Sequence, residues 1–344
     1  MMRRNYVNYQ AVFVILAMVF FQATPILAKT LRMSSWFPAA NPLMTEAFVP
    51  WAEEVKKVTQ GRVKVRIMKK TVGSVPAQFD VAKKGQVDIA FGNQSYSPGR
   101  FNQYAFVELP GNGDSAEVTS VAYWRIYNRF FAENSELGDV KLLSLFTHGP
   151  GQLFTNKHQV KSMDGNKGIK VRGGGVAATR VVEALGMTSI QAPFSKAAEM
   201  ISNGVVDGAM FDRSIVPAVG FTRYFNNRFT IKGGLYNVSY FVVMNRKSWD
   251  SLSAEDQAAI DAISGEAFAR TIGAVWDRMG HSADKEFEKI ALTTTTATGA
   301  FGQELKTVFE KFEKEWIDSV VTENIEGQKV IDAYRKEIEA MQAE

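Results

Sequence analysis

Apolar and polar positions along this chain predict two α/β units built on the same plan. Residues 61–66 (GRVKVR) and 168–172 (GIKVR) each predict a short strand with β-branched residues at alternate positions. Residues 84–91 (KGQVDIAF) and 203–210 (NGVVDGAM) each predict a helix that ends at a glycine and is followed by a mostly apolar strand, as buried parallel strands are. The repeated order of strand, helix, glycine turn and strand predicts two domains that face each other across a cleft.

The same patterning predicts how the two units are joined. We expect a helix over residues 45–58, strands near residues 63–68 and 87–92, a first crossing at residues 153–155 and a return strand over residues 240–244. Helical periodicity over residues 253–290 predicts one long helix, and residues 293–298 form a polar, threonine-rich break. From Gly302 onward, the spacing of aromatic residues predicts two amphipathic helices that pack on the first domain.

The sequence around Arg172 predicts an anion-binding site. A strand ends in Arg172, three glycines follow at residues 173–175, and an amphipathic helix starts at Val176. This arrangement aims a guanidinium fork and free helix N–H groups at one point, which suits a carboxylate or a phosphate. Two other interpretations stay open. The glycines fit a loose dinucleotide-binding pattern, although no acidic residue clearly ends a second strand about 20 residues later, or they form a plain turn beside a surface ion pair of Arg172.

The first 28 residues have the pattern of a secretory signal peptide. Arg3 and Arg4 precede an unbroken apolar run over residues 11–21, and Ala28 supplies a small residue for cleavage. This run is too short to span a bilayer, which needs about 20 apolar residues. We therefore expect residues 1–28 to be removed and the mature chain to reach the periplasm, with an uncleaved anchor as the alternative.

Composition and charge narrow the classes of function. The chain is 46% hydrophobic and 22% charged, which is typical of globular domains with a full core. Without Arg3 and Arg4, the chain has 38 basic and 36 acidic residues. The resulting net charge of +2 is not the excess of positive charge that indicates nucleic-acid binding. The sequence has no cysteine, which excludes thiol nucleophiles and cysteine-based zinc sites.

Sequence patterns for catalysis or metal binding are absent. Of the three histidines, His148, His158 and His281, none has metal-ligand spacing to another. No nucleophile elbow, zinc-helix motif or phosphate loop occurs. We therefore expect a binding protein without cofactor or metal, not an enzyme. An exported enzyme acting on organic acids is the alternative, and His148 is its one candidate base.

Six segments, in their order and spacing, resemble the solute-binding subunit of the tripartite ATP-independent periplasmic (TRAP) transporters. They lie at residues 36–43 (WFPAANPL), 85–90 (GQVDIA), 147–152 (THGPGQ), 168–172 (GIKVR), 204–208 (GVVDG) and 243–253 (VMNRKSWDSLS). The resemblance runs from Leu31 to about Leu292. It implies a type II-like periplasmic binding protein with two α/β domains, two hinge strands, a central ligand cleft and a long helix backing both domains. It also implies capture of a small organic acid and its delivery to a membrane permease.

The resemblance implies a role for Arg172, and two departures from the family pattern narrow the ligand. In the family, the arginine that ends the Lys-any-Arg strand, here Arg172, binds the ligand carboxylate. Members that bind sialic acid or C4-dicarboxylates usually carry a second arginine where this chain has Gln152, and many have an asparagine where it has Phe211. A buried carboxylate without a charged partner is unfavourable by several kcal/mol. We therefore expect a monocarboxylate or 2-oxo acid with an apolar or aromatic tail, with a C4-dicarboxylate as the alternative.

The expected ligand site combines an arginine with polar and aromatic residues at strand ends and in loops, where open α/β sheets present their crevice. Its members are Arg172, Gln152, Trp36, Phe37, Tyr96, Asn93, His148, Phe211, Asp212 and Tyr236. The expected domains are residues 29–151 plus 246–344, which include the C-terminal helices, and residues 152–245. The expected partners are the organic acid and the TRAP permease subunits. We expect a monomer, with a dimer through the terminal helices as the alternative.

Overall fold

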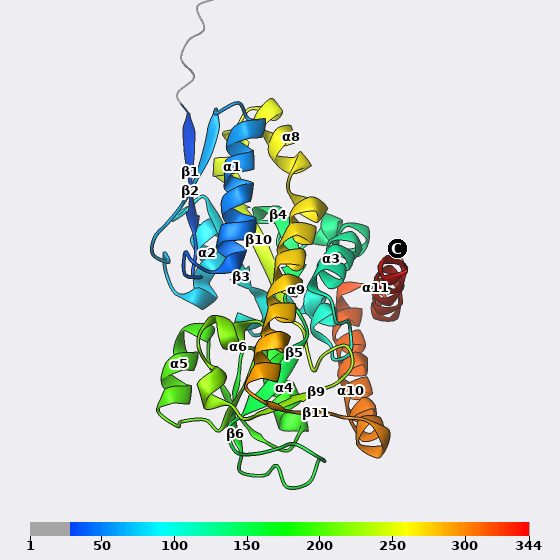
Figure 1. Cartoon of the computed structure of the whole chain (residues 1–344). Coiled ribbons are helices and arrows are strands. Elements are labelled where there is room, and N and C mark those ends of the chain that lie inside the picture. The colour runs from blue at the N-terminus through cyan, green and yellow to red at the C-terminus, as the bar shows by residue number, and fades with distance from the viewer. Residues whose placement is uncertain (1–27, 344) are drawn as a thin grey trace, which may run out of the picture.

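Two mixed β-sheets organise the part of the chain that the structure, a computed structural model, describes, residues 28–343 (Figure 1). The signal-peptide prediction falls on residues 1–28 and so lies, except for Ala28, outside the described residues. In spatial order, the first sheet contains β2 (Val63–Ile67), β1 (Lys29–Ser34), β3 (Ile89–Asn93), β10 (Ser239–Asn245) and β4 (Val140–Thr147). The second sheet contains β11 (Thr293–Thr296), β9 (Asn227–Thr230), β5 (Gly151–Thr155), β8 (Gly208–Asp212), β6 (Lys170–Gly173) and β7 (Thr188–Gln191).

Both sheets combine parallel and antiparallel pairs. β1 is parallel to β2 and β3, while β10 lies antiparallel between β3 and β4. In the second sheet, β6 is parallel to β7 and β8, and β5 is antiparallel to β8 and β9. The chain enters the second sheet between β4 and β5 and returns between β9 and β10. The prediction of a two-unit α/β fold is confirmed. The first crossing lies over residues 148–150, just before the predicted residues 153–155, which already belong to β5.

Four central strands of the two sheets are buried at every residue. β3, β5, β8 and β10 are buried along their whole length because helices or the opposite unit cover both of their faces. Their sequences are mostly apolar, so the polar residues at their ends are the exceptions. Asn93 ends β3 and Asp212 ends β8, and both are almost fully buried.

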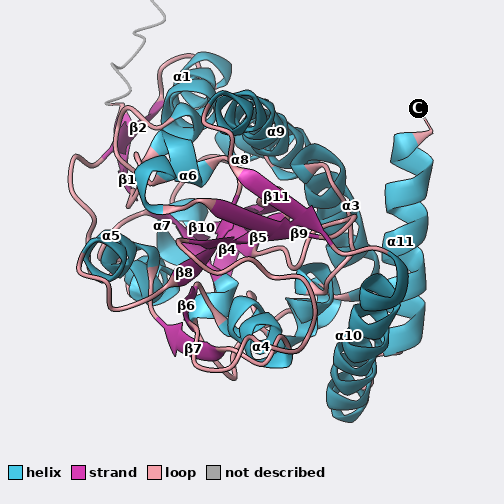
Figure 2. Cartoon of the chain, turned by 60° about the horizontal axis from the view of Figure 1, so that its bottom comes forward, coloured by secondary structure: helices cyan, strands magenta, loops and turns pink. Residues whose placement is uncertain are grey.

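Helices cover the outer faces of both sheets, as Figures 1 and 2 show. Those of the first unit are α1 (Val49–Val58), α2 (Gln78–Lys83), α3 (Ala116–Phe130), α7 (Arg246–Asp250) and α8 (Ala254–Ala262). Those of the second unit are α4 (Val176–Ala184), α5 (Phe194–Ser202) and α6 (Ile215–Ala218). A π-helical turn at Met44–Phe48 leads into α1, so the helix predicted over residues 45–58 is present with an irregular first turn.

One long helix, α9 (Gly265–Lys289), runs along both units. At about 1.5 Å per residue it is roughly 37 Å long. The predicted helix over residues 253–290 is broken, because Gly265 has φ +58° and Ser264 is extended. Gly265 lies under the Trp124 ring, where an added Cβ would come within 2.8 Å of ring carbon, so the glycine permits both the turn and the contact.

Close packing joins α9 to α3. A Cβ added at Gly273 would lie 2.5 Å from the Cα of Glu117, so the two helix backbones touch directly there. One turn later, the Asp277 carboxylate accepts hydrogen bonds from Ser115 Oγ at 2.6 Å and from the backbone N–H of Ala116 at 2.7 Å and Glu117 at 3.1 Å. An acidic side chain at a helix N-terminus satisfies N–H groups that have no partner within the helix.

The C-terminal segment spans both units. The threonine-rich segment predicted as a break forms β11, which pairs parallel with β9, so Thr293–Thr296 belong to the second sheet and not to the first unit. Helix α10 (Gly299–Val320) starts beside this sheet, where Phe301 stacks on Phe229, and ends on the first unit, where Trp316 Nε1 donates to the Asn102 carbonyl at 2.9 Å. Helix α11 (Gly327–Gln342) packs on α3. The two predicted helices are confirmed.

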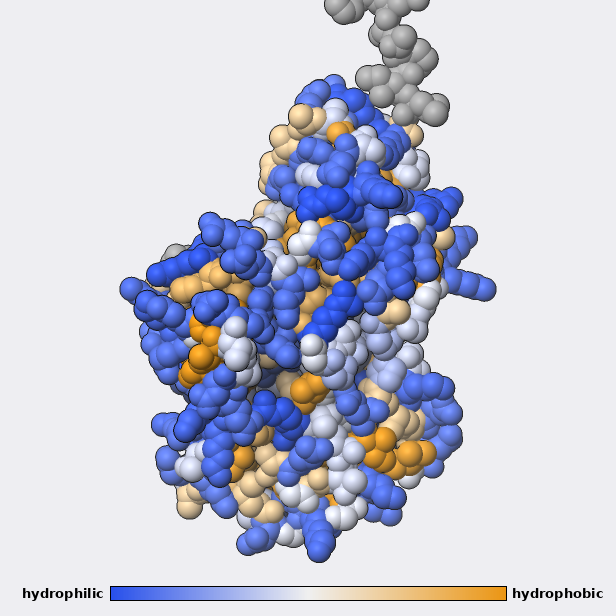
Figure 3. Space-filling view, turned by 180° about the vertical axis from the view of Figure 1, so that it is seen from behind, coloured by the Kyte–Doolittle hydropathy of each residue, from blue (hydrophilic) through white to orange (hydrophobic). Residues whose placement is uncertain are grey.

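The surface is mostly hydrophilic, and the apolar patches on the face shown in Figure 3 are small and separated by polar side chains. Among residues 28–343, no helix has both the length and the apolar character needed to cross a bilayer.

The contact between α9 and α3 makes a test of stability. We expect Gly273→Ala to lower the free energy of unfolding by about 1–3 kcal/mol, although alanine is the better helix former, because the new methyl group meets backbone that is not free to yield. Gly302→Ala in α10, where the nearest atom lies 3.2 Å from the added Cβ, is the control with a smaller expected change. Urea unfolding measures both, and a Gly273→Ala protein as stable as the parent would contradict this packing.

Candidate functional site

A cavity lies between the two sheets, where strand ends from both units meet, and its space of about 430 Å³ includes a part open to solvent. We call it the Arg172 cavity. Its lining is mainly aromatic and comes from β1, β3, β6, β8, β10 and α9 or from the loops beside them. The lining residues are Trp36, Phe37, Asn93, Tyr96, His148, Arg172, Gly174, Phe194, Met210, Phe211, Asp212, Ile215, Tyr236, Val238, Tyr240 and Trp276.

Nine of the ten residues predicted from the sequence line this cavity together. They are Trp36, Phe37, Asn93, Tyr96, His148, Arg172, Phe211, Asp212 and Tyr236. Strand geometry explains the convergence, because the ends of neighbouring strands in both sheets open onto the same space.

The structure places Gln152 outside the Arg172 cavity. Its side chain lines a separate hollow with Arg213, Arg228 and Asp284, and not the Arg172 cavity. Gln152 lies directly opposite Phe211 in the β5–β8 ladder, and of this pair only Phe211 reaches the cavity. The amide oxygen of Gln152 is buried and has no hydrogen-bond partner among the described residues.

Sequence reasoning missed several lining residues, above all Trp276, Phe194 and Tyr240. The sequence pattern predicts Tyr240 on the return strand and gives it no role in the site. Trp276 is one of many apolar positions on a long amphipathic helix, and Phe194 opens α5, so the sequence distinguishes neither from a core residue. Gly174 belongs to the predicted glycine run, but its function is packing. An added Cβ there would lie 2.9 Å from Arg172 Nη1.

Arg172 is a buried cation held in place by backbone. It is 2% exposed, its Nε donates to the Ala192 carbonyl at 3.0 Å, and its Nη1 donates to the Met210 carbonyl at 3.1 Å. The guanidinium carbon lies 5.1 Å from the centre of the Phe211 ring. No carboxylate within residues 28–343 forms a salt bridge with Arg172. A buried charge without a counter-ion is strongly unfavourable, so this site favours binding of an anion.

Asp212 and His148 add further polar groups to the lining of the cavity. Oδ1 of Asp212 accepts hydrogen bonds from Trp276 Nε1 at 2.8 Å, from the Ser214 N–H at 2.9 Å and from the Ser214 hydroxyl. Oδ2 of Asp212 is buried and unpaired among the described residues. Nδ1 of His148 contacts the Gly149 carbonyl oxygen. Burial lowers the pKa of His148, while the nearby Asp212 charge opposes this shift, so the imidazole is neutral near pH 7.

Three tyrosines add hydroxyl groups to the cavity. Burial raises the pKa of Tyr236 and of Tyr240, so both stay protonated, while the Arg172 charge opposes the shift at Tyr236. The Tyr96 hydroxyl accepts a hydrogen bond from the Phe194 N–H at 3.0 Å, which leaves its own proton free to donate. These hydroxyls and Arg172 provide donors that suit a carboxylate.

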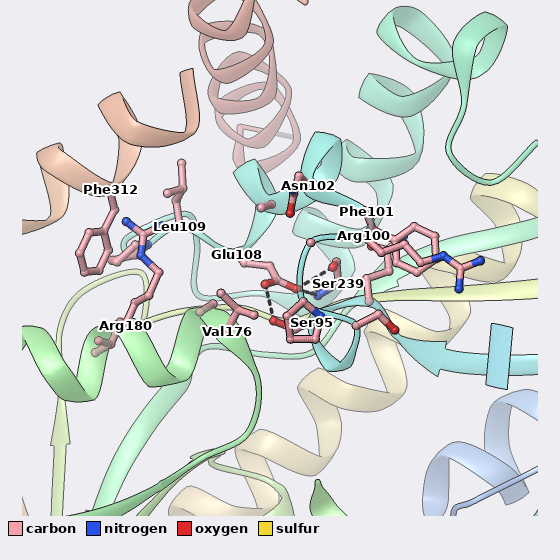
Figure 4. A pocket seen from close by; sticks show the side chains of 18 residues that line it. Ser95, Arg100, Phe101, Asn102, Glu108, Leu109, Val176, Arg180, Ser239 and Phe312 are labelled. Carbon is pink, nitrogen blue, oxygen red and sulfur yellow. Dashed lines mark hydrogen bonds between the residues drawn. The ribbon is translucent and has the colours of Figure 1, made fainter. Parts of the chain in front are cut away.

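A second cavity of about 740 Å³, which we call the Glu108 cavity, lies beside the first (Figure 4). At its centre, the Glu108 carboxylate accepts hydrogen bonds from Ser95 Oγ at 2.7 Å and Ser239 Oγ at 2.6 Å, and burial raises the pKa of Glu108. Its two arginines are already paired, Arg100 with Asp80 and Arg180 with Glu315. Although this cavity is larger, the unpaired buried cation makes the Arg172 cavity the better anion site.

Ser95 separates the two cavities by packing against the second unit. A Cβ added at Gly175 would lie 2.8 Å from Ser95 Cβ and 2.9 Å from its Oγ, so no side chain fits there. The glycine run therefore receives a side chain of the opposite unit. This packing argues against the dinucleotide interpretation, in which these glycines would leave room for a pyrophosphate. Within residues 28–343, no group of three or more His, Cys, Asp or Glu side chains is placed to hold a metal ion.

Comparison with known proteins agrees with this architecture. Residues 33–319 match the family model of bacterial extracellular solute-binding proteins, family 7. A curated relative from Comamonas testosteroni, the outer membrane transporter protein TsaT, is 31% identical and aligns with 91% of this chain and 92% of its own length.

Two solved TRAP solute-binding proteins are close in structure. One from Bordetella bronchiseptica, with bound (R)-mandelate and (S)-mandelate, is 32% identical, with a TM-score of 0.88 over 91% of this chain and 99% of its own. One from a marine metagenome, specific for aromatic acid ligands and bound to 3-hydroxybenzoate, is 30% identical, with a TM-score of 0.84 over the same shares. The chain therefore belongs to family 7 of the bacterial extracellular solute-binding proteins, the solute-binding proteins of TRAP transporters.

Proposed function

We propose that this protein is a periplasmic receptor that binds a small aromatic monocarboxylate and delivers it to a TRAP permease. The observation that carries the proposal is the guanidinium of Arg172, which is buried, held by two backbone carbonyls and free of any carboxylate partner within residues 28–343. A ligand carboxylate would supply the missing counter-charge through a bidentate pair of hydrogen bonds.

The charges around the cavity favour one carboxylate over two. Arg172 is the one arginine or lysine among the lining residues, and Asp212 adds a negative charge to the same lining. A second ligand carboxylate would lie near Asp212 without a cation of its own. These charges, and not Gln152, disfavour the C4-dicarboxylate alternative.

The apolar lining favours an aromatic tail. Trp36 and Phe37 pack together with ring centres 4.2 Å apart, and Phe194 lies 6.4 Å from Trp36 across the cleft. Aromatic walls of this kind bury a ring with good packing and few polar losses. The relatives bound to mandelate and 3-hydroxybenzoate support the same ligand class.

We also propose that the two units close on the ligand as domains, about residues 29–151 plus most of 246–344, and residues 152–245. The two crossing segments, α9 and α10 would form the hinge region. In the closed arrangement, the Tyr96 hydroxyl accepts from the Phe194 N–H and Ser95 packs on Gly175, so the two contacts hold opposite walls of the cleft together.

We find less support for a catalytic role than for a receptor, and less for a dimer than for a monomer. His148 is the one imidazole at the cavity, and its Nδ1 is committed to the Gly149 carbonyl. The apolar residues of α10 and α11, including Phe309, Trp316 and Tyr334, are buried within the chain itself. We therefore propose a monomeric receptor without enzymatic activity.

Arg172→Lys tests the carboxylate anchor. We expect it to weaken binding of phenylacetate roughly 10- to 100-fold, because an ammonium group keeps the charge but loses the planar fork that is held by Ala192 and Met210. Calorimetric titration of ligand-free protein measures this, with Arg228→Lys in the separate hollow as a matched control. Unchanged affinity in Arg172→Lys would remove Arg172 from the site.

A thermal-shift panel tests the choice of one carboxylate. Ligands that bind the folded state alone raise the melting temperature by mass action. We expect benzoate, phenylacetate and mandelate to raise it and succinate and malate to leave it unchanged at the same concentration. A rise with the dicarboxylates alone would keep the receptor and overturn the monocarboxylate assignment.

Gly175→Ala tests closure without touching the ligand. We expect roughly tenfold or greater loss of affinity for phenylacetate, because the methyl group clashes with Ser95 in the closed arrangement. Adding Ser95→Gly should restore most of the affinity by making room. If Gly175→Ala binds as tightly as the parent, the Ser95–Gly175 contact is no part of closure.

A further inference from the structure

The Arg172 cavity contains hydrogen-bond acceptors that a carboxylate ligand does not use. Asp212 lines the cavity, is 3% exposed and has Oδ2 without a partner among the described residues. His148 lines it too and is 4% exposed. Because Nδ1 of His148 faces the Gly149 carbonyl oxygen, the proton of the neutral ring belongs on Nδ1, and Nε2 is left as an acceptor.

These acceptors are unusual in a site for an anion. Arg172, Tyr236 and Tyr240 can all donate to a carboxylate, but Asp212 Oδ2 and His148 Nε2 would repel its oxygens. Burial removes the hydration of an acceptor, and without a donor no hydrogen bond compensates for that loss. The cost in free energy is larger when the acceptor is charged. A ligand that fills the cavity therefore needs to bring a hydrogen-bond donor to this end.

The position of the acceptors indicates where that donor lies on the ligand. Arg172 Nη1 is fixed on the carbonyl of Met210, and Asp212 follows two residues later on the same strand, β8. Two residues of strand separate the backbones of Met210 and Asp212 by about 6.8 Å, a spacing that suits a carboxylate on the Arg172 side and a group directly beside it on the Asp212 side. The donor thus belongs next to the carboxyl group, and the ring belongs on the Trp36, Phe37 and Phe194 side.

We propose that the ligand is an aromatic 2-hydroxy acid, whose carboxylate binds Arg172 and whose hydroxyl donates a hydrogen bond to the acceptor pair Asp212 Oδ2 and His148 Nε2. This inference rests on the proposed function and narrows it. A 2-oxo acid, which the sequence left open, presents an acceptor at the same place and meets two acceptors of the protein.

Three ligands of nearly equal size and shape test the proposal on the unaltered protein. Phenylacetate has the carboxylate and the ring alone, mandelate adds a donor at position 2, and phenylglyoxylate adds an acceptor there. We expect calorimetric titration to give mandelate, as its tighter-binding enantiomer, roughly 10- to 100-fold higher affinity than phenylacetate, and phenylglyoxylate the lowest affinity. Equal affinities for mandelate and phenylacetate, or tighter binding of phenylglyoxylate than of mandelate, would overturn the proposal. Either result would leave the proposed receptor function intact. Binding of none of the three would overturn the proposed function itself.

Asp212→Asn tests the residue. The amide keeps an oxygen for Trp276 and Ser214 and places an N–H donor where Oδ2 was. We expect the ratio of mandelate to phenylglyoxylate affinity to fall at least tenfold, since the oxo group now finds a donor. Asp284→Asn, in the hollow beside Arg213 and Arg228, is the matched control and should leave the ratio unchanged. An equal loss for all three ligands in Asp212→Asn would assign Asp212 a structural role and overturn its part in recognition. If this variant fails to fold, the ranking on the unaltered protein still decides the proposal.

Discussion

The buried charge of Arg172 is the constraint on which the rest of the site depends. Its guanidinium is almost fully removed from water and is held by the carbonyls of Ala192 and Met210, with no carboxylate of the described chain as a partner. Backbone carbonyls fix its orientation but do not neutralise its charge, so the site is complete only with an anion. In the proposed receptor, a bound organic acid relieves this unfavourable electrostatic state, and the difference in free energy favours the loaded form.

The fold makes this arrangement possible by bringing two sheets together at their strand ends and by backing both with α9. Glycines set how closely side chains and backbone segments approach each other. Gly174 lets the Arg172 guanidinium pack against backbone, Gly175 receives Ser95 from the opposite unit, and Gly273 lets α9 touch α3. The first two lie between the units, where the available space would limit the proposed closure, and the third holds α9 against α3.

Much of the fold and of the candidate site could be predicted from the sequence. Strand periodicity reports on local structure, and the Lys-any-Arg end of a strand indicates which side chain lies at the edge of the sheet. The two sheets and nine of the predicted site residues follow that logic. Gln152 did not, since the hollow that it lines is formed with Arg213, Arg228 and Asp284, which are distant in sequence. Trp276 and β11 were missed for the same reason. An apolar helix position and a run of threonines acquire their roles only from tertiary contacts.

A crystal structure with 4-bromophenylacetate tests the central claim most directly, because the bromine's anomalous signal fixes which way the ligand lies. The account predicts carboxylate oxygens within hydrogen-bond distance of Arg172 and the bromine among Trp36, Phe37 and Phe194, with Ser95 packed on Gly175. A carboxylate bound elsewhere, such as beside Arg100 or Arg180 in the Glu108 cavity, would contradict it.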